Sequence, residues 1–374
     1  MRLLICAGGT GGGVYPALNV LRETKTDLKD VLWVGGEGGI EADLVQRAGV
    51  AYESIPAAGV HGVSLKSLPG NILQLVRGVA ASRRILRRFK PDVLFFTGGF
   101  VAVPMAAAGW RIPSMLFVPD IEPGLAIKAI ASFASRITVP NKDAFRHYPP
   151  RQQKKLLVTG YPVRADLGHL TKEQARQQLG LDPNLPVLLV TGGSKGAQTI
   201  NKTISALLPS ILTRFQVLHI SGSNNFTDVQ QVRQQLPQAL QQNYHIYAYL
   251  HDEMSAALAS ADLIISRAGA STLGEYPMAG TPAILIPYPW AWRYQKVNAE
   301  YLQRQNAAIF LRDEEMPEKL GQIINDLFDH PAKLEYMRQC MASLSQPQAA
   351  TNIAQVLMQL ADNPRKADGR EVAP

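Results

Sequence analysis

Two similar stretches decide the fold, Leu3-Leu4-Ile5-Cys6-Ala7-Gly8-Gly9-Thr10-Gly11-Gly12-Gly13 and Val187-Leu188-Leu189-Val190-Thr191-Gly192-Gly193-Ser194-Lys195-Gly196-Ala197. Each is a short apolar run, typical of a buried parallel strand, that ends in a glycine loop and continues into a helix-compatible stretch. Backbone N–H groups in such a loop can approach an anion closely, and the helix N-terminus adds a favourable dipole. The repeat predicts two nucleotide-binding-type α/β domains that face each other across a cleft.

Length and composition also favour two soluble domains. The chain has 374 residues, of which 46% are hydrophobic and 18% charged, which is typical of a folded protein and too long for one ordinary α/β core. There is no run of 18 apolar uncharged residues, and Met1 leads directly into the first strand, so we expect neither a spanning helix nor a cleavable signal. The two cysteines, Cys6 and Cys340, give no disulfide framework and no metal-ligand spacing.

Apolar runs alternate with helical stretches in both halves, which predicts a doubly wound parallel sheet in each. In the first half we expect strands at 3–6, 31–34, 52–55, 93–96, 114–117 and 137–139, and helices at 17–24, 40–47, 72–89 and 126–133. In the second half we expect strands at 187–190, 217–220, 246–249, 263–265 and 283–286, and helices at 200–212, 225–235, 254–260, 334–344 and 352–360. The polar, proline-marked stretch 149–155 indicates the start of the link between the domains.

These patterns give an N-terminal domain over 1–161 and a C-terminal domain over 162–345. A last helix at about 346–363 is expected to pack back on the first domain, followed by a flexible tail over 364–374.

The net charge of +8 is concentrated in one block. There is no Asp or Glu from Ser54 to Pro91, whereas seven basic residues fall there, namely Lys66, Arg77, Arg83, Arg84, Arg87, Arg88 and Lys90. Apolar residues recur at helical spacing in the same block, so 65–90 could lie as a basic amphipathic helix against an anionic membrane surface. The alternative is an ordinary crossover helix with a solvated basic side. Nucleic acid is not expected, because the block has one Phe and no other aromatic residue to stack on bases.

A third glycine loop, Ser266-Arg267-Ala268-Gly269-Ala270-Ser271-Thr272, follows the strand at 263–265. We expect the N–H groups of Ala270, Ser271 and Thr272 to face a diphosphate, with a helix dipole behind them. Glu275, placed one turn inside that helix, would lie near a ribose diol, for which a carboxylate is a good partner. Alternatively, Glu275 serves only as a first-turn partner of the helix dipole.

Five ordered motifs give the chain a close resemblance to a known family. They are Gly8-Gly9-Thr10-Gly11-Gly12, Gly98-Gly99-Phe100-Val101, Gly160-Tyr161-Pro162-Val163-Arg164, Gly192-Gly193-Ser194-Lys195-Gly196-Ala197 and the segment 267–275. Over residues 1 to about 360 the chain resembles MurG-type N-acetylglucosaminyltransferases. The resemblance implies the GT-B fold and an inverting transfer from UDP-N-acetylglucosamine to a muramyl-pentapeptide on undecaprenyl diphosphate, the conversion of lipid I to lipid II in peptidoglycan synthesis. It also implies a peripheral position on the cytoplasmic face of the bacterial cell membrane.

Carried over motif by motif, the resemblance implies the following site. Arg164 and Ser194 contact the diphosphate, the backbone at Leu250 and His251 borders the uracil, and Glu275 holds the ribose. Gln295 contacts the sugar hydroxyls, although Tyr294 replaces the first of the family's two adjacent glutamines. The remaining donor-side residues are Thr10, Gly11 and Gly12, and the acceptor-side residues are Gly13, Gly98, Gly99 and Phe100.

Two departures from the family pattern affect the acceptor side. Gly13 stands where family members have a histidine, and Val118-Pro119-Asp120-Ile121 followed by Glu122 replaces a His-Glu-Gln-Asn stretch. Inversion needs a group that takes the proton of the acceptor hydroxyl. Asp120 or Glu122 could be this base, with a pKa raised where water is excluded. Alternatively, Asp120 only caps the following helix.

The departures leave alternatives for the function. One is a related transferase with a different acceptor or sugar, and another is a non-catalytic protein that binds a nucleotide sugar. Asp-x-Asp is absent, and helix N-termini together with Arg164 could neutralise the leaving diphosphate, so we expect no metal and no cofactor.

Overall fold

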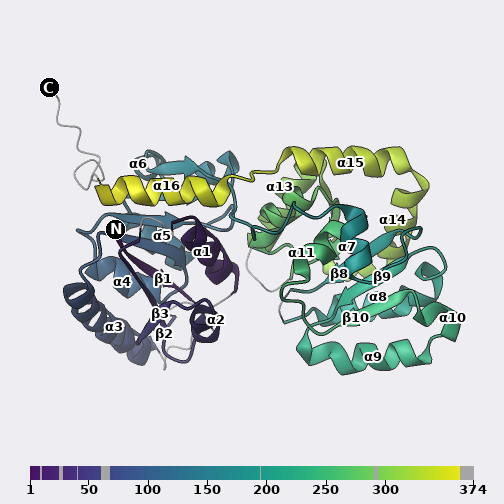
Figure 1. Ribbon diagram of the computed structural model, residues 1–374, viewed down its shortest axis with the longest axis horizontal. Coiled ribbons are helices and arrows are strands. Elements are labelled where there is room, and N and C mark those ends of the chain that lie inside the picture. Colours follow the sequence, from purple (N-terminus) through teal and green to yellow (C-terminus); the bar gives the residue numbers. More distant parts are fainter. Residues whose placement is uncertain are drawn as a thin grey trace. The chain divides into compact units, whose positions relative to one another are not determined.

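A computed structural model of the protein describes residues 1–8, 11–24, 28–39, 41–59, 68–193, 195–289 and 294–362. The chain forms two compact units (Figure 1): Met1–Val163 with the C-terminal segment from Pro347 is unit 1, and Arg164–Gln346 is unit 2. The predicted tail, 364–374, and the first residues of the basic block, 65–67, lie outside the described residues.

Unit 1 contains a seven-stranded parallel sheet in the order β3-β2-β1-β4-β5-β6-β7. The strands are β1 (Arg2–Ala7), β2 (Asp30–Gly36), β3 (Ala51–Ile55), β4 (Val93–Gly98), β5 (Ser114–Phe117), β6 (Arg136–Val139) and β7 (Leu156–Val158). Successive strands run outward from β1 in one direction and from β4 in the other. The switch point of this doubly wound sheet therefore lies between β1 and β4.

Two groups of helices pack on this sheet. In one, α1 contacts α2 and α16, and in the other α4 contacts α3 and α5. The helices of unit 1 are α1 (Gly11–Thr24), α2 (Glu41–Arg47), α3 (Leu68–Phe89), α4 (Ala102–Ala108), α5 (Leu125–Phe133), α6 (Pro150–Gln153) and α16 (Ala349–Asp362), with the 3₁₀ helix η2 (Lys142–His147). The C-terminal α16 lies beside α1, where the Thr351 hydroxyl donates to the Glu23 carboxylate at 3.0 Å (Figure 1).

Unit 2 contains a six-stranded parallel sheet in the order β10-β9-β8-β11-β12-β13. Its strands are β8 (Val187–Thr191), β9 (Gln216–Ile220), β10 (Tyr244–Tyr247), β11 (Leu263–Ser266), β12 (Ala283–Leu285) and β13 (Ala308–Phe310). The order repeats that of the first six strands of unit 1. The similarity of the two quoted stretches therefore reflects a repeated topology, with the switch point between β8 and β11.

The helices of unit 2 connect and cover these strands. They are α7 (Lys172–Gln178), α8 (Gln198–Ile211), α9 (Phe226–Gln235), α10 (Gln238–Gln241), α11 (Met254–Ser260), α12 (Glu275–Ala279), α13 (Tyr294–Arg304), α14 (Met316–Asp329) and α15 (Pro331–Ser343), with the 3₁₀ helices η3 (Ser223–Asn225), η4 (Ala270–Leu273) and η5 (Asp313–Glu315).

Each unit has its own core because its strands are apolar on both faces. In β1, Leu4 and Cys6 pack in a cluster with side chains of α3, α4 and α5, while the intervening Leu3 and Ile5 are equally buried on the other face. The strand β8 has the same two-sided burial in unit 2. Helices on both faces of a parallel sheet require such continuous apolar runs. The predicted fold class, two doubly wound parallel α/β domains, is confirmed.

The prediction that 149–155 begins the link between the domains was wrong. Pro150–Gln153 forms α6, and the chain then adds β7 to the sheet beside β6. The strand was missed because it has three residues and lies at the sheet edge, where Leu157 and Val158 are exposed. The two units separate after Val163. In unit 2, β10 begins at Tyr244, two residues earlier than predicted.

Candidate functional site

Most candidate site residues follow strands at or next to the two switch points. In unit 1 they lie after β1, β4 and β5, and in unit 2 most of them lie after β8 and β11. Open α/β sheets bind ligands at this edge, beyond the carboxyl ends of the strands. Two predicted contacts, Thr10 and Ser194, lie outside the described residues.

Gly13 lies in the first turn of α1, together with Gly11 and Gly12. The Thr97 hydroxyl, at the end of β4, donates to the carbonyl oxygen of Gly13 at 2.7 Å. A Cβ atom on Gly13 would lie 3.2 Å from that hydroxyl oxygen, so a larger residue requires a small shift of Thr97. Thr97 is a site residue that the sequence did not single out, although it directly precedes the Gly98-Gly99 motif.

Gly98 and Gly99 join β4 to α4 in conformations that favour glycine, with φ angles of 112° and 82°. A Cβ atom on Gly99 would lie 2.5 Å from the carbonyl oxygen of Gly8, at the end of β1. Glycine therefore allows the loops after the two central strands to approach each other. The next residue, Phe100, is 43% exposed and is accessible to a ligand.

Asp120 and Glu122 follow β5 and precede α5. Asp120 is half-buried, whereas Glu122 is 7% exposed. The N-cap of α5 is Gly124, so the alternative in which Asp120 caps this helix is wrong. Both carboxylates lie beyond the carboxyl end of a strand next to β4.

A buried carboxylate close to the first glycine loop was missed. Glu41, the first residue of α2, is 1% exposed and accepts the N–H of Gly36 at 2.9 Å. A Cβ atom on Gly8 or Gly39 would lie within 2.4 Å of its Oε1, so the surrounding glycines make room for this side chain. Burial, and secondly the charge of Glu41, raise the pKa of Tyr52 to about 12. The glycine-rich run that precedes Glu41 was the available signal.

In unit 2 the structure brings Arg164, His251 and Glu275 together. Arg164 Nη1 donates to the carbonyl oxygen of His251 at 2.8 Å, and its Nε lies 3.7 Å from Glu275 Oε1. Burial raises the pKa of Glu275, while Arg164 and a hydrogen bond with Ser271 oppose this shift. Leu250 is 4% exposed, which leaves mainly backbone at this position to meet a ligand. The arrangement places a cation and an anion side by side, as recognition of a nucleoside diphosphate requires.

The segment after β11 differs from the prediction in two respects. It forms η4 followed by α12, and Glu275 is the first residue of this five-residue helix, not one turn inside a longer one. The Thr272 N–H donates to the carbonyl oxygen of Gly269 at 3.0 Å, so in this structure it is used within the loop, and its contact with a diphosphate stays a prediction. The N–H groups of Ala270 and Ser271 precede the first hydrogen bond of η4 and remain the candidates.

The glycine loop after β8 packs closely on the end of β9. A Cβ atom on Gly196, whose φ is 75°, would lie 2.1 Å from the carbonyl oxygen of Ser221. Close by, the buried His219 lies 2.7 Å from the Tyr244 hydroxyl and 3.0 Å from Asn201 Oδ1. Burial lowers the pKa of His219 to about 3. The neutral ring therefore joins α8, β9 and β10 beside this loop.

Gln295, in the first turn of α13, accepts the N–H of Tyr288 at 2.9 Å through Oε1. Tyr288 in turn contacts Arg267, whose guanidinium lies 5.3 Å from the centre of the Tyr288 ring. Arg267 also donates to the Thr199 hydroxyl at 2.8 Å and pairs with Asp313. Since Arg267 belongs to the loop after β11, it connects that loop to Tyr288, the backbone partner of Gln295.

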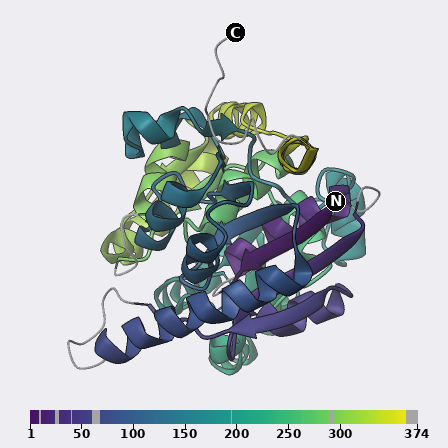
Figure 2. The ribbon, with the colours of Figure 1, turned by 90° about the vertical axis from the view of Figure 1, so that its left-hand side faces the viewer.

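The helix α3, which runs across the front of the view in Figure 2, carries exposed side chains that are both apolar and basic. Ile72, Leu73 and Val76 are 49%, 50% and 61% exposed. Of the exposed arginines, Arg88 pairs with Glu53.

Within the described ranges no helix is long and apolar enough to cross a membrane. Over the same ranges no group of three or more His, Cys, Asp or Glu side chains is arranged to hold a metal ion.

Comparison with protein-family models gives two matches that together cover most of the chain. Residues 3–139 match the N-terminal domain of glycosyltransferase family 28, and residues 187–355 match its C-terminal domain. Among curated proteins, the chain is 34% identical to a UDP-N-acetylglucosamine--N-acetylmuramyl-(pentapeptide) pyrophosphoryl-undecaprenol N-acetylglucosamine transferase of Roseiflexus sp. (strain RS-1), over 96% of this chain and 94% of the relative. It is 35% identical to the protein of the same name from Desulfitobacterium hafniense (strain Y51), over 96% of this chain and 100% of the relative.

Solved structures give the same fold. The crystal structure of Acinetobacter baumannii MurG is similar with a TM-score of 0.75 at 23% identity, over 96% of this chain and 99% of that one. A UDP-GlcNAc 2-epimerase from Neisseria meningitidis, bound to UDP-GlcNAc, is similar with a TM-score of 0.67 at 15% identity, over 96% of this chain and 100% of that one.

Proposed function

Because the chain belongs to glycosyltransferase family 28, we infer that it transfers N-acetylglucosamine from UDP-N-acetylglucosamine to N-acetylmuramyl-(pentapeptide) pyrophosphoryl-undecaprenol. This reaction converts lipid I to lipid II in peptidoglycan synthesis. The observation that carries the inference is the identity of 34–35% to transferases of this name over 96% of the chain. The resemblance found in the sequence motifs is thereby confirmed.

The decisive experiment combines purified protein, UDP-N-acetylglucosamine and a short-chain lipid-linked muramyl-pentapeptide. We expect release of UDP together with a product heavier by one N-acetylglucosamine, and no UDP release without the acceptor. Binding of UDP-N-acetylglucosamine without transfer would instead indicate a non-catalytic protein. Transfer to another acceptor or from another UDP-sugar alone would indicate a related transferase, an outcome that Gly13 and Asp120 make worth testing.

For the donor we propose that unit 2 binds the nucleotide. Glu275 accepts hydrogen bonds from the ribose hydroxyls, and Arg164 lies against the diphosphate. The contacts of Arg164 with His251 and Glu275 support this assignment, because they hold both charged groups in one place. The N–H groups of Ala270 and Ser271 complete the anion site, and the Gln295 amide, whose oxygen is held by Tyr288, donates to a sugar hydroxyl.

For the proton transfer we propose a carboxylate after β5 as the general base. The base takes the proton of the attacking hydroxyl as the new bond to the sugar forms and the bond to UDP breaks. Gly13 has no proton-accepting side chain. Asp120 is favoured over Glu122 because it is half-buried, whereas Glu122 is 7% exposed and less accessible to an acceptor.

The leaving UDP carries charge that must be neutralised. We propose that Arg164 and main-chain N–H groups do this without a metal ion. Transfer is then expected to continue in the presence of a chelator. Loss of activity on chelation and its recovery with a divalent ion would contradict this proposal.

For the membrane we propose that the protein binds peripherally, on the cytoplasmic face, through α3. The exposed Ile72, Leu73 and Val76 supply apolar contacts, and the arginines of the helix attract anionic lipid headgroups. This placement would bring unit 1 to its lipid-linked acceptor.

A further inference from the structure

A polar cavity in unit 2 is separate from the candidate donor residues. Its volume is about 490 Å³, and it has one charged wall and one apolar wall. Lys172, Glu335 and Arg338 form the charged wall, and Leu167, Leu170 and Met278 contribute to the apolar one. A cavity of this size is within the range that holds small organic ligands.

The charged wall lies at the edge of the sheet opposite the candidate donor site. Lys172 and Arg338 both contact Asp262, which directly precedes β11. Arg267 and Glu275 follow the other end of the same strand. The cavity is therefore not part of the site proposed for the nucleotide.

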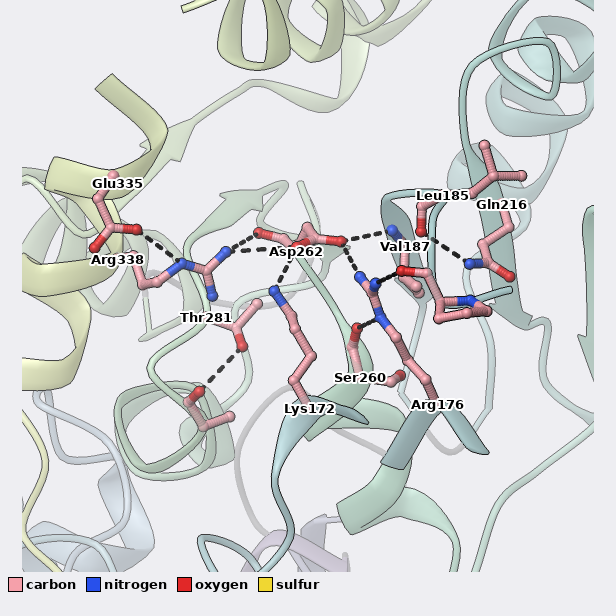
Figure 3. A network of polar contacts seen from close by, with 12 residues as sticks. Lys172, Arg176, Leu185, Val187, Gln216, Ser260, Asp262, Thr281, Glu335 and Arg338 are labelled. Atoms are coloured by element: carbon pink, nitrogen blue, oxygen red, sulfur yellow. Dashed lines mark hydrogen bonds and ion pairs between the residues drawn. The ribbon is translucent and has the colours of Figure 1, made fainter. Parts of the chain in front are cut away.

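Asp262 is surrounded by three cations (Figure 3). Its carboxylate lies 2.5 Å from Lys172 Nζ, 2.6 Å from Arg176 Nη2 and 3.7 Å from Arg338 Nη2. It also accepts the N–H of Val187 at 2.7 Å. The carboxylate accepts three hydrogen bonds and lies beside a third cation, so one negative charge is shared among Lys172, Arg176 and Arg338.

Glu335 is the second carboxylate of the cluster, and its Oε2 lies 3.4 Å from Arg338 Nε. The cluster thus has three cations against Asp262 and Glu335, and the exposed Glu173 on α7 is a third carboxylate that interacts with Lys172 and Arg176. Glu335 is more than half exposed, which weakens its interaction through solvent screening. Among the residues that line the cavity, two cations, Lys172 and Arg338, stand against one carboxylate, Glu335.

Lys172 is the cation with most to gain from a further partner. A lysine ammonium has three protons, and in the described part of the chain Lys172 donates to Asp262. Burial lowers the pKa of Lys172, although the charge of Asp262 opposes the shift. The Lys172 side chain is 29% exposed, so its ammonium is partly desolvated, and an anion in the cavity would add a hydrogen-bond partner.

We propose that this cavity binds a small organic phosphate monoester, with the phosphate on Lys172 and Arg338 and the organic group on Leu167, Leu170 and Met278. Arginine and lysine together are suited to phosphate oxygens, because the guanidinium offers paired N–H groups and the ammonium a concentrated charge. The site is additional to the donor and acceptor sites of the proposed transferase.

The test is calorimetric titration of the full-length protein with phenyl phosphate at low salt, in the presence of saturating UDP. UDP fills the donor site, so any phenyl phosphate that binds must bind elsewhere. We expect one site, with affinity weakened about tenfold or more by Arg338→Gln. Glu335→Gln should tighten binding several-fold, because it removes a competing carboxylate from the same wall.

Arg214→Gln is the matched control, since it breaks an exposed arginine pair with Asp329 elsewhere in unit 2 and should leave the affinity unchanged. Absence of binding to wild type, equal affinity in wild type and Arg338→Gln, or equal binding of uncharged phenol would each overturn the proposal. UDP binding and sugar transfer by the same preparations report separately on the proposed function.

Discussion

Gly99 combines two constraints at one carbon atom. Its φ of 82° is costly for other residues, and an added Cβ atom would lie 2.5 Å from the carbonyl oxygen of Gly8. We expect Gly99→Ala to destabilise unit 1 by roughly 2–5 kcal/mol, of which about 1–2 come from the backbone angle and the rest from overlap. The measurement is the free energy of unfolding from urea titration.

Gly180→Ala separates the two constraints. Gly180 also has a positive φ, 64°, but nothing lies within 4 Å of its added Cβ atom. Gly180→Ala should therefore lower the free energy of unfolding only by the part that comes from the backbone angle, about 1–2 kcal/mol. Equal losses in the two variants would show that the approach of the loops after β1 and β4 is not what requires glycine at position 99.

Asp120 is expected to determine the rate of transfer and not the binding of the donor. Asp120→Asn should lower kcat by roughly 10²–10⁴-fold, the usual contribution of a general base, with the Kd of UDP unchanged. Glu122→Gln should have a smaller effect, because the side chain is 7% exposed. Near-normal kcat in both variants would exclude a base after β5.

Glu275 is expected to make UDP binding depend on pH. Ribose hydroxyls donate to the ionised carboxylate, so binding favours the deprotonated form and lowers its pKa in the complex. Because burial raises the pKa of free Glu275, the affinity for UDP should be full above that raised pKa and fall as the pH decreases through it. Titration calorimetry of UDP between pH 8 and pH 5 measures this.

Glu275→Gln should bind UDP about tenfold more weakly at neutral pH and lack this part of the pH dependence. Protonation of the UDP phosphate, with a pKa of about 6, affects both proteins equally and cancels in the comparison. Parallel curves for wild type and Glu275→Gln would contradict a ribose contact. Glu173→Gln, which changes an exposed carboxylate on α7, is the control.

Single residues were predictable from the sequence where a motif carries them. Arg164 and Glu275 are 111 residues apart in the sequence, and the motifs predict that both contact the nucleotide. In the structure Arg164 Nε lies 3.7 Å from Glu275 Oε1. Glu41 and Thr97 could not be found in this way, because their importance comes from contacts with Gly36 and Gly13 that exist only in the folded sheet. The sequence also did not show that a 3₁₀ turn uses the N–H of Thr272 within the loop.

Among the elements, fully buried apolar strands were predictable, whereas two short and partly exposed strands were not. β1, β4 and β8 are buried along their length and bounded by glycines, so the sequence pattern found them. β7 and β13 have three residues each, of which one is buried, whereas β12 is equally short but fully buried and was predicted. α7 was missed although Thr171 and Gln174 form a capping box, because a helix of seven residues has little apolar periodicity.

The α3 helix is the element expected to bind membranes. Replacing Ile72, Leu73 and Val76 together by serine should weaken binding to vesicles with anionic lipid by about tenfold or more, because each apolar side chain contributes up to about 1.5–3 kcal/mol when fully buried. Cosedimentation with vesicles of phosphatidylcholine containing phosphatidylglycerol measures the change. Leu157→Ser, which removes an exposed apolar side chain from β7, is the control and should bind as wild type does.

The charges of α3 can be tested separately. Replacing Arg83, Arg84 and Arg87 by glutamine should weaken binding to anionic vesicles by up to about 1 kcal/mol per arginine, with little change on phosphatidylcholine alone. Salt should reduce wild-type binding in the same way, because it screens exposed charges. If both triple variants bind as wild type does, α3 is an ordinary crossover helix and the membrane contact lies elsewhere.

At the scale of the whole molecule, the duplication of topology was the most predictable property. The two glycine loops, about 185 residues apart, follow the first strand of sheets that share one strand order. The segment from Pro347 belongs to unit 1 and not to unit 2, which precedes it in the chain. The sequence analysis expects this last helix on the first domain, and α16 contacts α1 of unit 1.

Two separate cores, one in each unit, make a prediction about how a ligand stabilises the protein. If UDP binds unit 2, UDP at 100 times its Kd should add about 2.7 kcal/mol to the stability of that unit. Amide hydrogens of β8 and β11 that exchange through unfolding of unit 2 should then exchange about 100-fold more slowly. Those of β1 and β4 should be unchanged, because they exchange through the unfolding of a different core.

Hydrogen exchange with mass spectrometry resolves these strands, and Glu275→Gln at the same UDP concentration should show a smaller effect. Protection confined to β1 and β4 would place the nucleotide in unit 1. Equal protection of all four strands would mean that the two cores unfold as one, and either result would remove the basis for assigning donor binding to unit 2.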